Sequence, residues 1–332
     1  MSLSLALALP VALAAAPAQA AKPAAIAVDR VTFPVTLSDG GTYTVVAYHY
    51  HRHGAQGRPL QVLVHGASYD HRYWDAGSVD GVNYSYARYM ASRDYDVLAI
   101  DQLGAGESDK PFGYFLNLAE TTSSVGQVLS NLRSPHSRLG HPSHRLYLVG
   151  HSNGSLTAIH EEAQNHLADG LVVTGWGHTY SPLPIDYAPI MALLQQPYIP
   201  ATGFPPFLRA FLFFHLPQTA PAMLGYDAST LATTISSGQF LDTLIYTSVP
   251  DMDGVGAVTG PVLVQMGDHD MIAPGANAPL EAAHWASASS VTVQGLSEMG
   301  HDVNLHLNHE QSWSQIDAWL SDQREEEEDD CD

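Results

Sequence analysis

The feature that most constrains this fold is a serine held between two glycines directly after an apolar run. Residues 145–150, RLYLVG, are typical of a buried β-strand, and residues 153–168 have a helical pattern. Ser152 therefore falls on a strand-to-helix turn between Gly150 and Gly154. A side chain at either glycine would collide with the backbone of so sharp a turn. We expect Ser152 in a sparsely allowed backbone region, at a cost of about 1 to 3 kcal/mol that is usually kept only where chemistry benefits.

Apolar strands alternate with helical stretches along most of the chain, with no internal repeat. The runs at 30–37 and 42–50, separated by Ser-Asp-Gly-Gly, predict an opening β-hairpin. Continuous apolar runs, typical of a parallel sheet covered on both faces, lie at 61–66, 96–101, 145–150, 171–176, 261–267 and 290–296. Helices are predicted near 82–93, 119–133, 153–168, 276–286 and 306–322. The pattern predicts an α/β fold with a mostly parallel sheet of about eight strands and helices on both faces.

The chain divides into four parts by composition. Residues 1–21 form a short apolar run ending in Ala-Gln-Ala, typical of a cleaved secretory signal, so we expect a secreted or periplasmic protein. Residues 22–180 and 261–322 are expected to form the α/β core. Residues 181–260, rich in proline and aromatic side chains, are far longer than an ordinary connection and predict a helical lid, in which Arg209 is the single cation of the apolar stretch 207–216. The acidic end, 323–332, is expected to be disordered.

Charge and cysteine content exclude some kinds of partner and cross-link. The chain has 13 Lys and Arg against 34 Asp and Glu, a net charge of −21, which argues against binding nucleic acid or anionic lipid. The single cysteine, Cys331, allows no intramolecular disulfide. The apolar stretches do not predict stable membrane insertion. His49, His51 and His53 alternate on one strand without a carboxylate or cysteine nearby, so no metal site is expected there.

Polar residues gather where the predicted parallel strands end. His65-Gly66-Ala67 follows one strand, and the stretch DQLGAGES begins at Asp101 after the next. Ser152 follows the third, while GDHD, which contains Asp268 and Asp270, and EMGHD, which contains His301, follow the last two. Because the carboxyl ends of parallel strands share one edge of the sheet, we expect these residues to lie together.

In this order the motifs resemble those of the α/β-hydrolase superfamily, in its serine esterase and lipase branch. The resemblance covers roughly residues 30–322. It implies that Ser152 is the nucleophile, that His301 is the general base and then the general acid, and that Asp270 orients His301. Asp268 competes with Asp270 for that last role, and the family's Gly-x-x-Asp…Pro context favours Asp270.

The resemblance also implies an oxyanion hole and no cofactor. Its donors would be the backbone N–H groups of Asn153 and of Ala67, or else of Ser68. Asp101 is expected to brace its own loop through hydrogen bonds. For the substrate pocket we expect Ser68, Tyr73, Trp74 and His178 to be candidates, with packing or structural roles as the alternative for the last three.

The sequence thus predicts an exported serine hydrolase that cleaves a carboxylic ester of a small apolar substrate through an acyl-enzyme. A lactonase, an amidase or aminopeptidase, and a carbon–carbon bond hydrolase would use the same triad and stay open as alternatives. A non-catalytic ligand-binding member of the same fold is a further alternative, although the serine, aspartate and histidine are all in place. The oligomeric state cannot be predicted.

Overall fold

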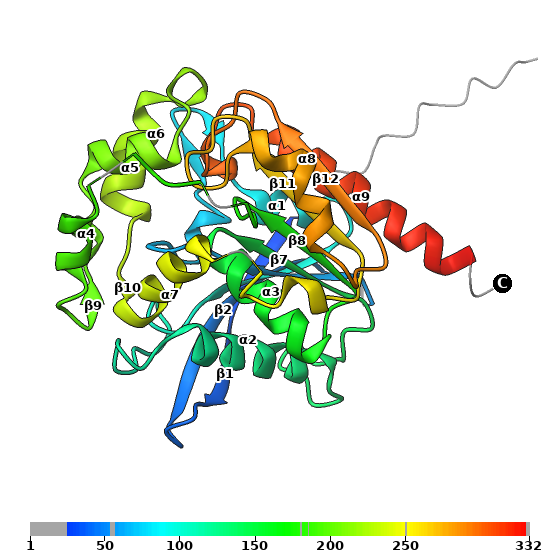
Figure 1. Cartoon of the computed structure of the whole chain (residues 1–332). Helices are drawn as coiled ribbons and strands as arrows, with labels where there is room; N and C mark the ends of the chain where they lie inside the picture. The colour runs from blue at the N-terminus through cyan, green and yellow to red at the C-terminus, as the bar shows by residue number, and fades with distance from the viewer. Residues whose placement is uncertain (1–24, 54–56, 180, 185, 250, 330–332) are drawn as a thin grey trace, which may run out of the picture.

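A sheet of eight strands runs through the computed structural model, which describes residues 25–53, 57–179, 181–184, 186–249 and 251–329, without the side chains of 325–329 (Figure 1). In spatial order the strands are β1 (Ile26–Thr36), β2 (Thr42–Arg52), β6 (Asp96–Asp101), β3 (Leu60–Val64), β7 (Leu146–His151), β8 (Gly170–Thr174), β11 (Val262–Gly267) and β12 (Val291–Leu296). β2 is antiparallel to both of its neighbours, β1 and β6. The other strands of the sheet run parallel to one another, in the order β6, β3, β7, β8, β11 and β12. The predicted fold class is confirmed.

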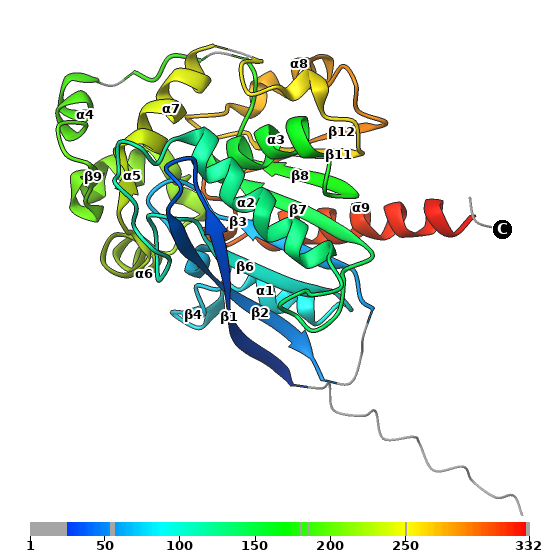
Figure 2. The ribbon, with the colours of Figure 1, turned by 90° about the horizontal axis from the view of Figure 1, so that it is seen from below.

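Helices cover both faces of this sheet, as the apolar strands require. α2 (Leu118–Arg133) and α3 (Asn153–Asn165) pack on one face, and α1 (Tyr86–Ala91) and α9 (Glu310–Asp329) on the other (Figure 2). Every residue of the central strand β3 is buried, because both of its faces are covered. A site is therefore expected at the carboxyl ends of the parallel strands, where the loops after successive strands meet.

Two predicted helices are clearly shorter in the structure. α1 begins only after Ser85, whose side chain accepts the N–H of Arg88, because residues 78–83 form the small hairpin of β4 (Ser78–Val79) and β5 (Val82–Asn83). The helix expected at 276–286 is divided into α8 (Ala278–Glu281) between short 3-10 turns.

The acidic end differs most from expectation, because α9 continues to Asp329 instead of ending at 322. The helix is anchored on the sheet by Trp313, Ile316, Trp319 and Leu320. Glutamate is a good helix former, and adding residues to an existing helix is far easier than starting one. The expectation of disorder from residue 323 is therefore corrected for 323–329.

The insertion, residues 181–260, lies between β8 and β11 and forms a layer at one end of the sheet (Figure 1). Its elements are α4 (Ala188–Leu193), β9 (Tyr198–Ile199), α5 (Pro206–Phe213), α6 (Pro221–Tyr226), β10 (Ile235–Ser236) and α7 (Ser237–Ser248). β9 and β10 pair, and Ile190, Ile199, Phe204, Ile235 and Phe240 form a hydrophobic cluster of their own.

The ends of the chain fall partly outside the described residues. The expected signal peptide at 1–21 lies there, and so do residues 330–332 of the acidic end. Among the helices that the structure describes, none combines the length and apolar character needed to cross a bilayer.

Candidate active site

The turn after β7 holds Ser152 in a strained conformation, with φ 52° and ψ −121°. The two glycines are explained by contact distances. A β-carbon at Gly150 would lie 2.5 Å from the Cα of Ser155, and one at Gly154 would lie 2.1 Å from the carbonyl oxygen of Val64. Both distances are far shorter than van der Waals contact, and the atoms concerned belong to the backbone, which cannot move aside as a flexible side chain could. The interpretation of the glycine-flanked serine as a crowded strand-to-helix turn is confirmed.

The strained turn is tied to the sheet and to the helix that follows. The N–H of Ser152 donates to the carbonyl of Thr174 at the end of β8, at 2.8 Å. α3 begins at Asn153, so the N–H groups of its first turn have no partner inside the helix and carry its positive end. Ser152 is 8% exposed and lines a cavity. The turn thus places a hydroxyl beside a cluster of N–H groups at a cavity wall.

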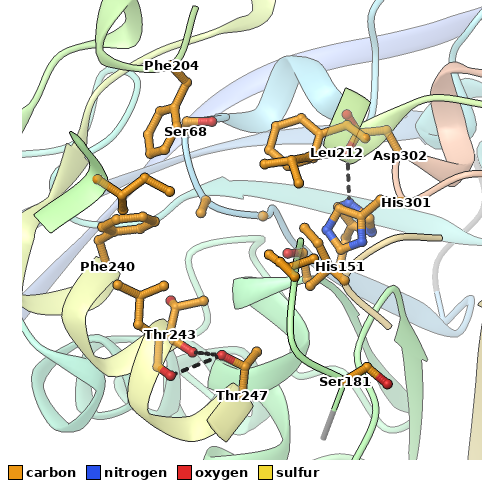
Figure 3. Close-up of a pocket in the computed structure, with 18 of the residues that line it drawn as sticks. Ser68, His151, Ser181, Phe204, Leu212, Phe240, Thr243, Thr247, His301 and Asp302 are labelled. Carbon is orange, nitrogen blue, oxygen red and sulfur yellow. Dashed lines mark hydrogen bonds and ion pairs between the residues drawn. The ribbon is translucent and has the colours of Figure 1, made fainter. Parts of the chain in front are cut away.

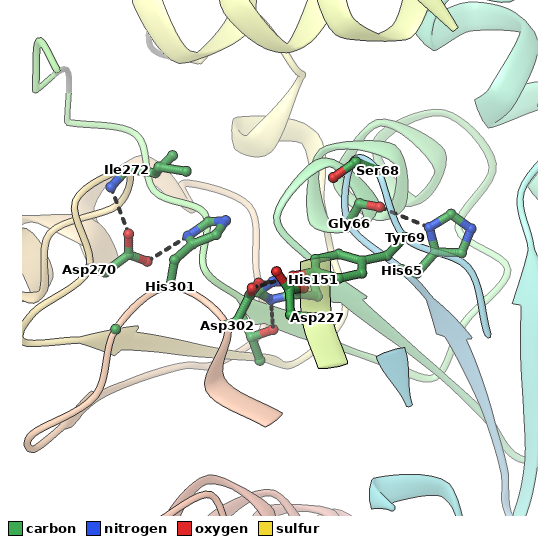
Figure 4. A network of polar contacts seen from close by, with 12 residues as sticks. His65, Gly66, Ser68, Tyr69, His151, Asp227, Asp270, Ile272, His301 and Asp302 are labelled. Carbon is green, nitrogen blue, oxygen red and sulfur yellow. Dashed lines mark hydrogen bonds and ion pairs between the residues drawn. The ribbon is translucent and has the colours of Figure 1, made fainter. Parts of the chain in front are cut away.

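A second pair of residues comes from the loops after β11 and β12. Nδ1 of His301 lies 2.9 Å from Oδ2 of Asp270, and both side chains are buried (Figure 4). The other carboxylate oxygen of Asp270 accepts the N–H groups of Ile272 and Ala273 at 2.7 and 2.9 Å. Asp268 is half exposed and accepts the N–H of Met299 instead. The structure therefore brings Asp270, and not Asp268, to His301.

Each member of this pair holds the other in its charged form. Burial raises the pKa of Asp270, but the charge and hydrogen bond of His301 outweigh it and leave that pKa below its ordinary value. Burial disfavours protonated His301, but the charge and hydrogen bond of Asp270 outweigh it and raise the pKa of His301. A buried imidazole stabilised as imidazolium is suited to accept a proton during a reaction.

Ser152 and His301 line the same cavity, which joins the two halves of the site. Within the described part of the chain, their side chains make no hydrogen bond with each other. Hydrogen bonds between a nucleophile and its base are often long without substrate and tighten in the complex. The chemistry requires the Ser152 hydroxyl to come within hydrogen-bonding reach of His301.

The loop after β3 offers further N–H donors beside the serine. The backbone N–H groups of Ala67 and Ser68 donate to no other described residue, and both residues line the cavity. His65 anchors the start of the loop, because its Nδ1 lies 2.9 Å from the carbonyl oxygen of Gly66 and its Nε2 accepts the N–H of Gln102. Together with Asn153, this loop has the free donors that an oxyanion would require.

Asp101 braces the neighbouring loops, as expected. Its carboxylate accepts the backbone N–H groups of His71 and Glu107, each at 2.8 Å, and contacts the His71 ring at 2.7 Å. A β-carbon at Gly106 would lie 2.1 Å from the same carboxylate, which explains a glycine at that position.

The cavity has a volume of about 330 Å³ and is mostly apolar (Figure 3). Most of its wall comes from the insertion, with Ile190, Met191, Phe204, Leu212, Phe213, Phe240 and Leu244. α7 adds hydroxyl groups from Thr243, Thr247 and Ser248, and Asn153 is tied to this helix because its amide donates to Thr243 at 2.7 Å. Of the predicted pocket residues, Ser68 lines the cavity.

The structure corrects the expectation for Tyr73, Trp74 and His178, which do not line the cavity. Tyr73 and Trp74 are buried in the core on the face covered by α1 and α9, where their rings pack edge to face. His178 is held between Asp253 and Glu281 at 3.0 and 2.6 Å. Burial opposes its charge, but these carboxylates raise the pKa of His178 to about 10.

Sequence reasoning missed two polar residues beside the pair of Asp270 and His301, namely His151 and Asp302. Nε2 of His151 lies 3.2 Å from Oδ1 of Asp302, and the Tyr69 hydroxyl contacts Asp302 and Asp227 (Figure 4). Burial and the nearby charge of His301 lower the pKa of His151 well below its ordinary value, so it stays neutral. The available signal was position, because His151 and Asp302 directly adjoin Ser152 and His301.

With this geometry in place, comparisons with known proteins give the class. A protein-family model described as serine aminopeptidase, S33 (Hydrolase_4), matches residues 81–307, more than half of the chain. The chain belongs to this family of the α/β-hydrolase superfamily, whose members are serine hydrolases. A comparison with curated protein sequences gave no match.

Solved structures share the fold at low sequence identity. An esterase from Thermogutta terrifontis is 16% identical, with a TM-score of 0.65 over 88% of this chain and 98% of that one. A monoacylglycerol lipase from Paleococcus ferrophilus is also 16% identical, with a TM-score of 0.60 over 90% and 99% of the two chains. A 2-hydroxy-6-oxo-6-phenylhexa-2,4-dienoate hydrolase from Rhodococcus sp. is 18% identical, with a TM-score of 0.61 over 91% and 100%.

Proposed function

We propose that this chain is a serine esterase that cleaves neutral, apolar carboxylic esters. The observation that carries the proposal is the apolar cavity whose wall contains both Ser152 and His301. Its volume, about 330 Å³, lies at the lower end of the range found for small-molecule sites. A short acyl or alcohol chain would bury its apolar surface against the insertion while its carbonyl carbon lies beside Ser152.

The proposed reaction assigns one role to each group. Ser152 Oγ attacks the carbonyl carbon while His301 accepts its proton, and Asp270 stabilises the imidazolium that forms. The N–H groups of Asn153 and Ala67 hold the oxyanion of the tetrahedral intermediate. His301 then donates its proton to the leaving alcohol, and the acyl group stays on Ser152. Water, deprotonated by His301, releases the acid and restores the serine.

The charges around the cavity favour a neutral ester over the alternatives. No lysine or arginine occurs among the described residues of the cavity wall, and Asp302, its one carboxylate, is already bound by His151 and Tyr69. An aminopeptidase substrate would bring an ammonium group, and a dienoate substrate would bring a carboxylate. Neither charge would find a free partner, and an unpaired buried charge is costly.

A substrate panel tests this proposal. We expect hydrolysis of p-nitrophenyl butyrate and octanoate and little hydrolysis of leucine p-nitroanilide or of p-nitrophenyl hemisuccinate, which adds a carboxylate to the acyl chain. The readout is kcat/KM for each compound with the same protein preparation. A kcat/KM for the anilide or the charged ester equal to that for the butyrate would contradict the proposal.

We also propose that the chain is exported. The support is the apolar run at 1–21 with its Ala-Gln-Ala end. Sequencing the N-terminus of protein recovered from outside the cytoplasm should find it to begin near residue 21 or 22. An intact Met1 on the recovered protein would contradict the proposal.

A further inference from the structure

A buried chain of polar side chains connects the insertion to both loops of the candidate active site. Arg209 on α5 is 1% exposed and Asp227 after α6 is 2% exposed. Arg209 contacts Ser68, and Asp227 contacts Tyr69 of the same loop. Tyr69 in turn contacts Asp302 on the other loop, and Figure 4 shows Asp227, Tyr69 and Asp302 together. These contacts thus link the insertion at 181–260 to Ser68 and Asp302. Ser68 adjoins the proposed oxyanion donor Ala67, and Asp302 adjoins the proposed base His301.

Arg209 uses its guanidinium in two directions. Nε and Nη2 form a two-pronged pair with the carboxylate of Asp227, each at 2.7 Å, and Nη1 donates to the hydroxyl of Ser68 at 2.8 Å. A buried ion pair seldom stabilises a fold more than apolar residues of the same size would, because both charges must be desolvated. The contact with Ser68 gives the pair a role that an apolar substitute could not perform.

Ser68 needs support from outside its own loop. Its φ of 61° lies in the left-handed region, which residues other than glycine rarely adopt. The insertion holds it at two points: Arg209 binds its hydroxyl, and the N–H of Thr233 donates to its carbonyl at 2.8 Å. These contacts fix the Ser68 side chain and the peptide unit that follows it. The N–H of Tyr69 in that unit donates to the carbonyl of Gly66 at 3.3 Å, so the same contacts constrain the turn that carries the free N–H groups of Ala67 and Ser68.

The same part of the insertion reaches the loop of His301. The Tyr69 hydroxyl donates to Asp227 at 2.6 Å and also contacts Asp302. The N–H of Asp302 donates to the carbonyl of Phe213, the last residue of α5, at 2.9 Å. The Phe213 ring lies 5.6 Å from the ring of His301. α5 therefore contacts both halves of the site, one through Arg209 and the other through Phe213.

We propose that Arg209 is a positioning residue, through which the insertion sets the backbone of residues 67–69 in the geometry that an oxyanion requires; this inference rests on the proposed function. The α5–α6 part of the insertion is then a fixed component of the active site. It cannot swing away as a lid without releasing Ser68 and displacing the oxyanion donors.

Two variants test the inference by kinetics. Ser68→Ala removes only the hydroxyl that Arg209 binds, and Arg209→Met combined with Asp227→Asn removes the guanidinium without leaving a buried charge unpaired. We expect kcat for p-nitrophenyl butyrate to fall about 10-fold in Ser68→Ala and further in the double variant, with KM changed less than about threefold, because misplaced donors weaken mainly the transition state. Unchanged kcat in both variants would overturn the inference.

Arg133→Met is the matched control, since Arg133 also forms an ion pair and binds loop carbonyls, but at the end of α2 away from the cavity. It should leave kcat unchanged even if the melting temperature falls. Hydrogen–deuterium exchange of the peptide spanning 60–74 should become faster in the double variant and stay unchanged in Arg133→Met. Unchanged exchange in the double variant would overturn the inference whether or not the parent protein cleaves esters. If the parent protein cleaves no ester, that result alone overturns only the proposed function.

Discussion

Two aspartates two positions apart differ entirely in their environment. Asp270 is buried, accepts two backbone N–H groups and contacts His301, whereas Asp268 is half exposed at the surface. Sequence spacing could favour Asp270 only through a family pattern. The burial and the contact with the imidazole depend on how the β11 and β12 loops pack against each other, which no local pattern encodes.

The two aspartates give a matched pair of variants. Asp270→Asn should lower kcat by a factor on the order of 10³ to 10⁴, because His301 loses the carboxylate that orients it and stabilises its charge. Asp268→Asn should change kcat less than about twofold, since its half-exposed carboxylate contacts the N–H of Met299 and the exposed ring of His269 but not His301. Steady-state hydrolysis of p-nitrophenyl butyrate measures both, and equal losses would contradict the assignment.

The pH profile tests the state of His301. The charge and hydrogen bond of Asp270 outweigh burial and raise the pKa of His301 above its ordinary value of about 6.5. Below its pKa, His301 already holds a proton and cannot accept one from Ser152. The acid limb of kcat/KM should therefore have a midpoint above about 6.5, and in the residual activity of Asp270→Asn that midpoint should move down. A parent midpoint below about 6.5 would contradict the raised pKa of His301.

At the level of elements, the buried strands, the serine turn and the presence of an insertion could be predicted, and the packing of the insertion could not. Continuous apolar runs such as 61–66 have one satisfactory environment, a doubly covered parallel sheet, so periodicity suffices. The insertion packs through contacts distant in sequence, as Arg209 with Ser68 shows. An arginine alone in an apolar stretch indicates a buried partner but cannot identify which one.

Tyr73 and Trp74 were candidates for the pocket with packing as the alternative, and the structure selects packing. Both follow the loop of Ala67 closely enough to reach the cavity, but they turn into the core beside α1. The sequence offers no signal for that direction, because an aromatic side chain is equally suited to a core and to a pocket.

The glycines of the serine turn give a prediction about stability. Gly154→Ala should lower the free energy of unfolding by at least about 2 kcal/mol, because the added carbon would lie 2.1 Å from a backbone oxygen. Gly225→Ala, on α6, meets nothing within 4 Å and should raise stability by up to about 1 kcal/mol, because alanine favours the helix. Urea denaturation measures the free energy of unfolding of both variants. Equal values would contradict the steric explanation of Gly154.

At the level of the whole molecule, one buried ion network joins three distant parts of the chain. His178 follows β8, Asp253 precedes β11 and Glu281 ends α8, and the Trp176 and Trp285 ring N–H groups also bind these carboxylates. The ring of His284 lies 5.4 Å from that of His178. The two carboxylates outweigh burial and raise the pKa of His178 to about 10, so His178 is charged in the folded protein at neutral pH.

This network predicts a specific loss of stability in alkali. Because the pKa of His178 is raised to about 10 in the folded state, its contribution is complete below about pH 6.5 and is lost as the pH rises toward 10. The free energy of unfolding of His178→Gln should therefore be lower at pH 6 and depend less on pH between 7 and 10. The exposed His136→Gln serves as control, and the same pH dependence in His178→Gln as in the parent would contradict the prediction.

The most direct test of the central claim is to label the protein with a fluorophosphonate and locate the adduct by peptide mass spectrometry. Since such probes react with a serine activated by an imidazole, the account predicts one adduct, on the peptide that contains Ser152, and no labelling of Ser152→Ala. An adduct on another residue, or equal labelling of Ser152→Ala, would contradict it.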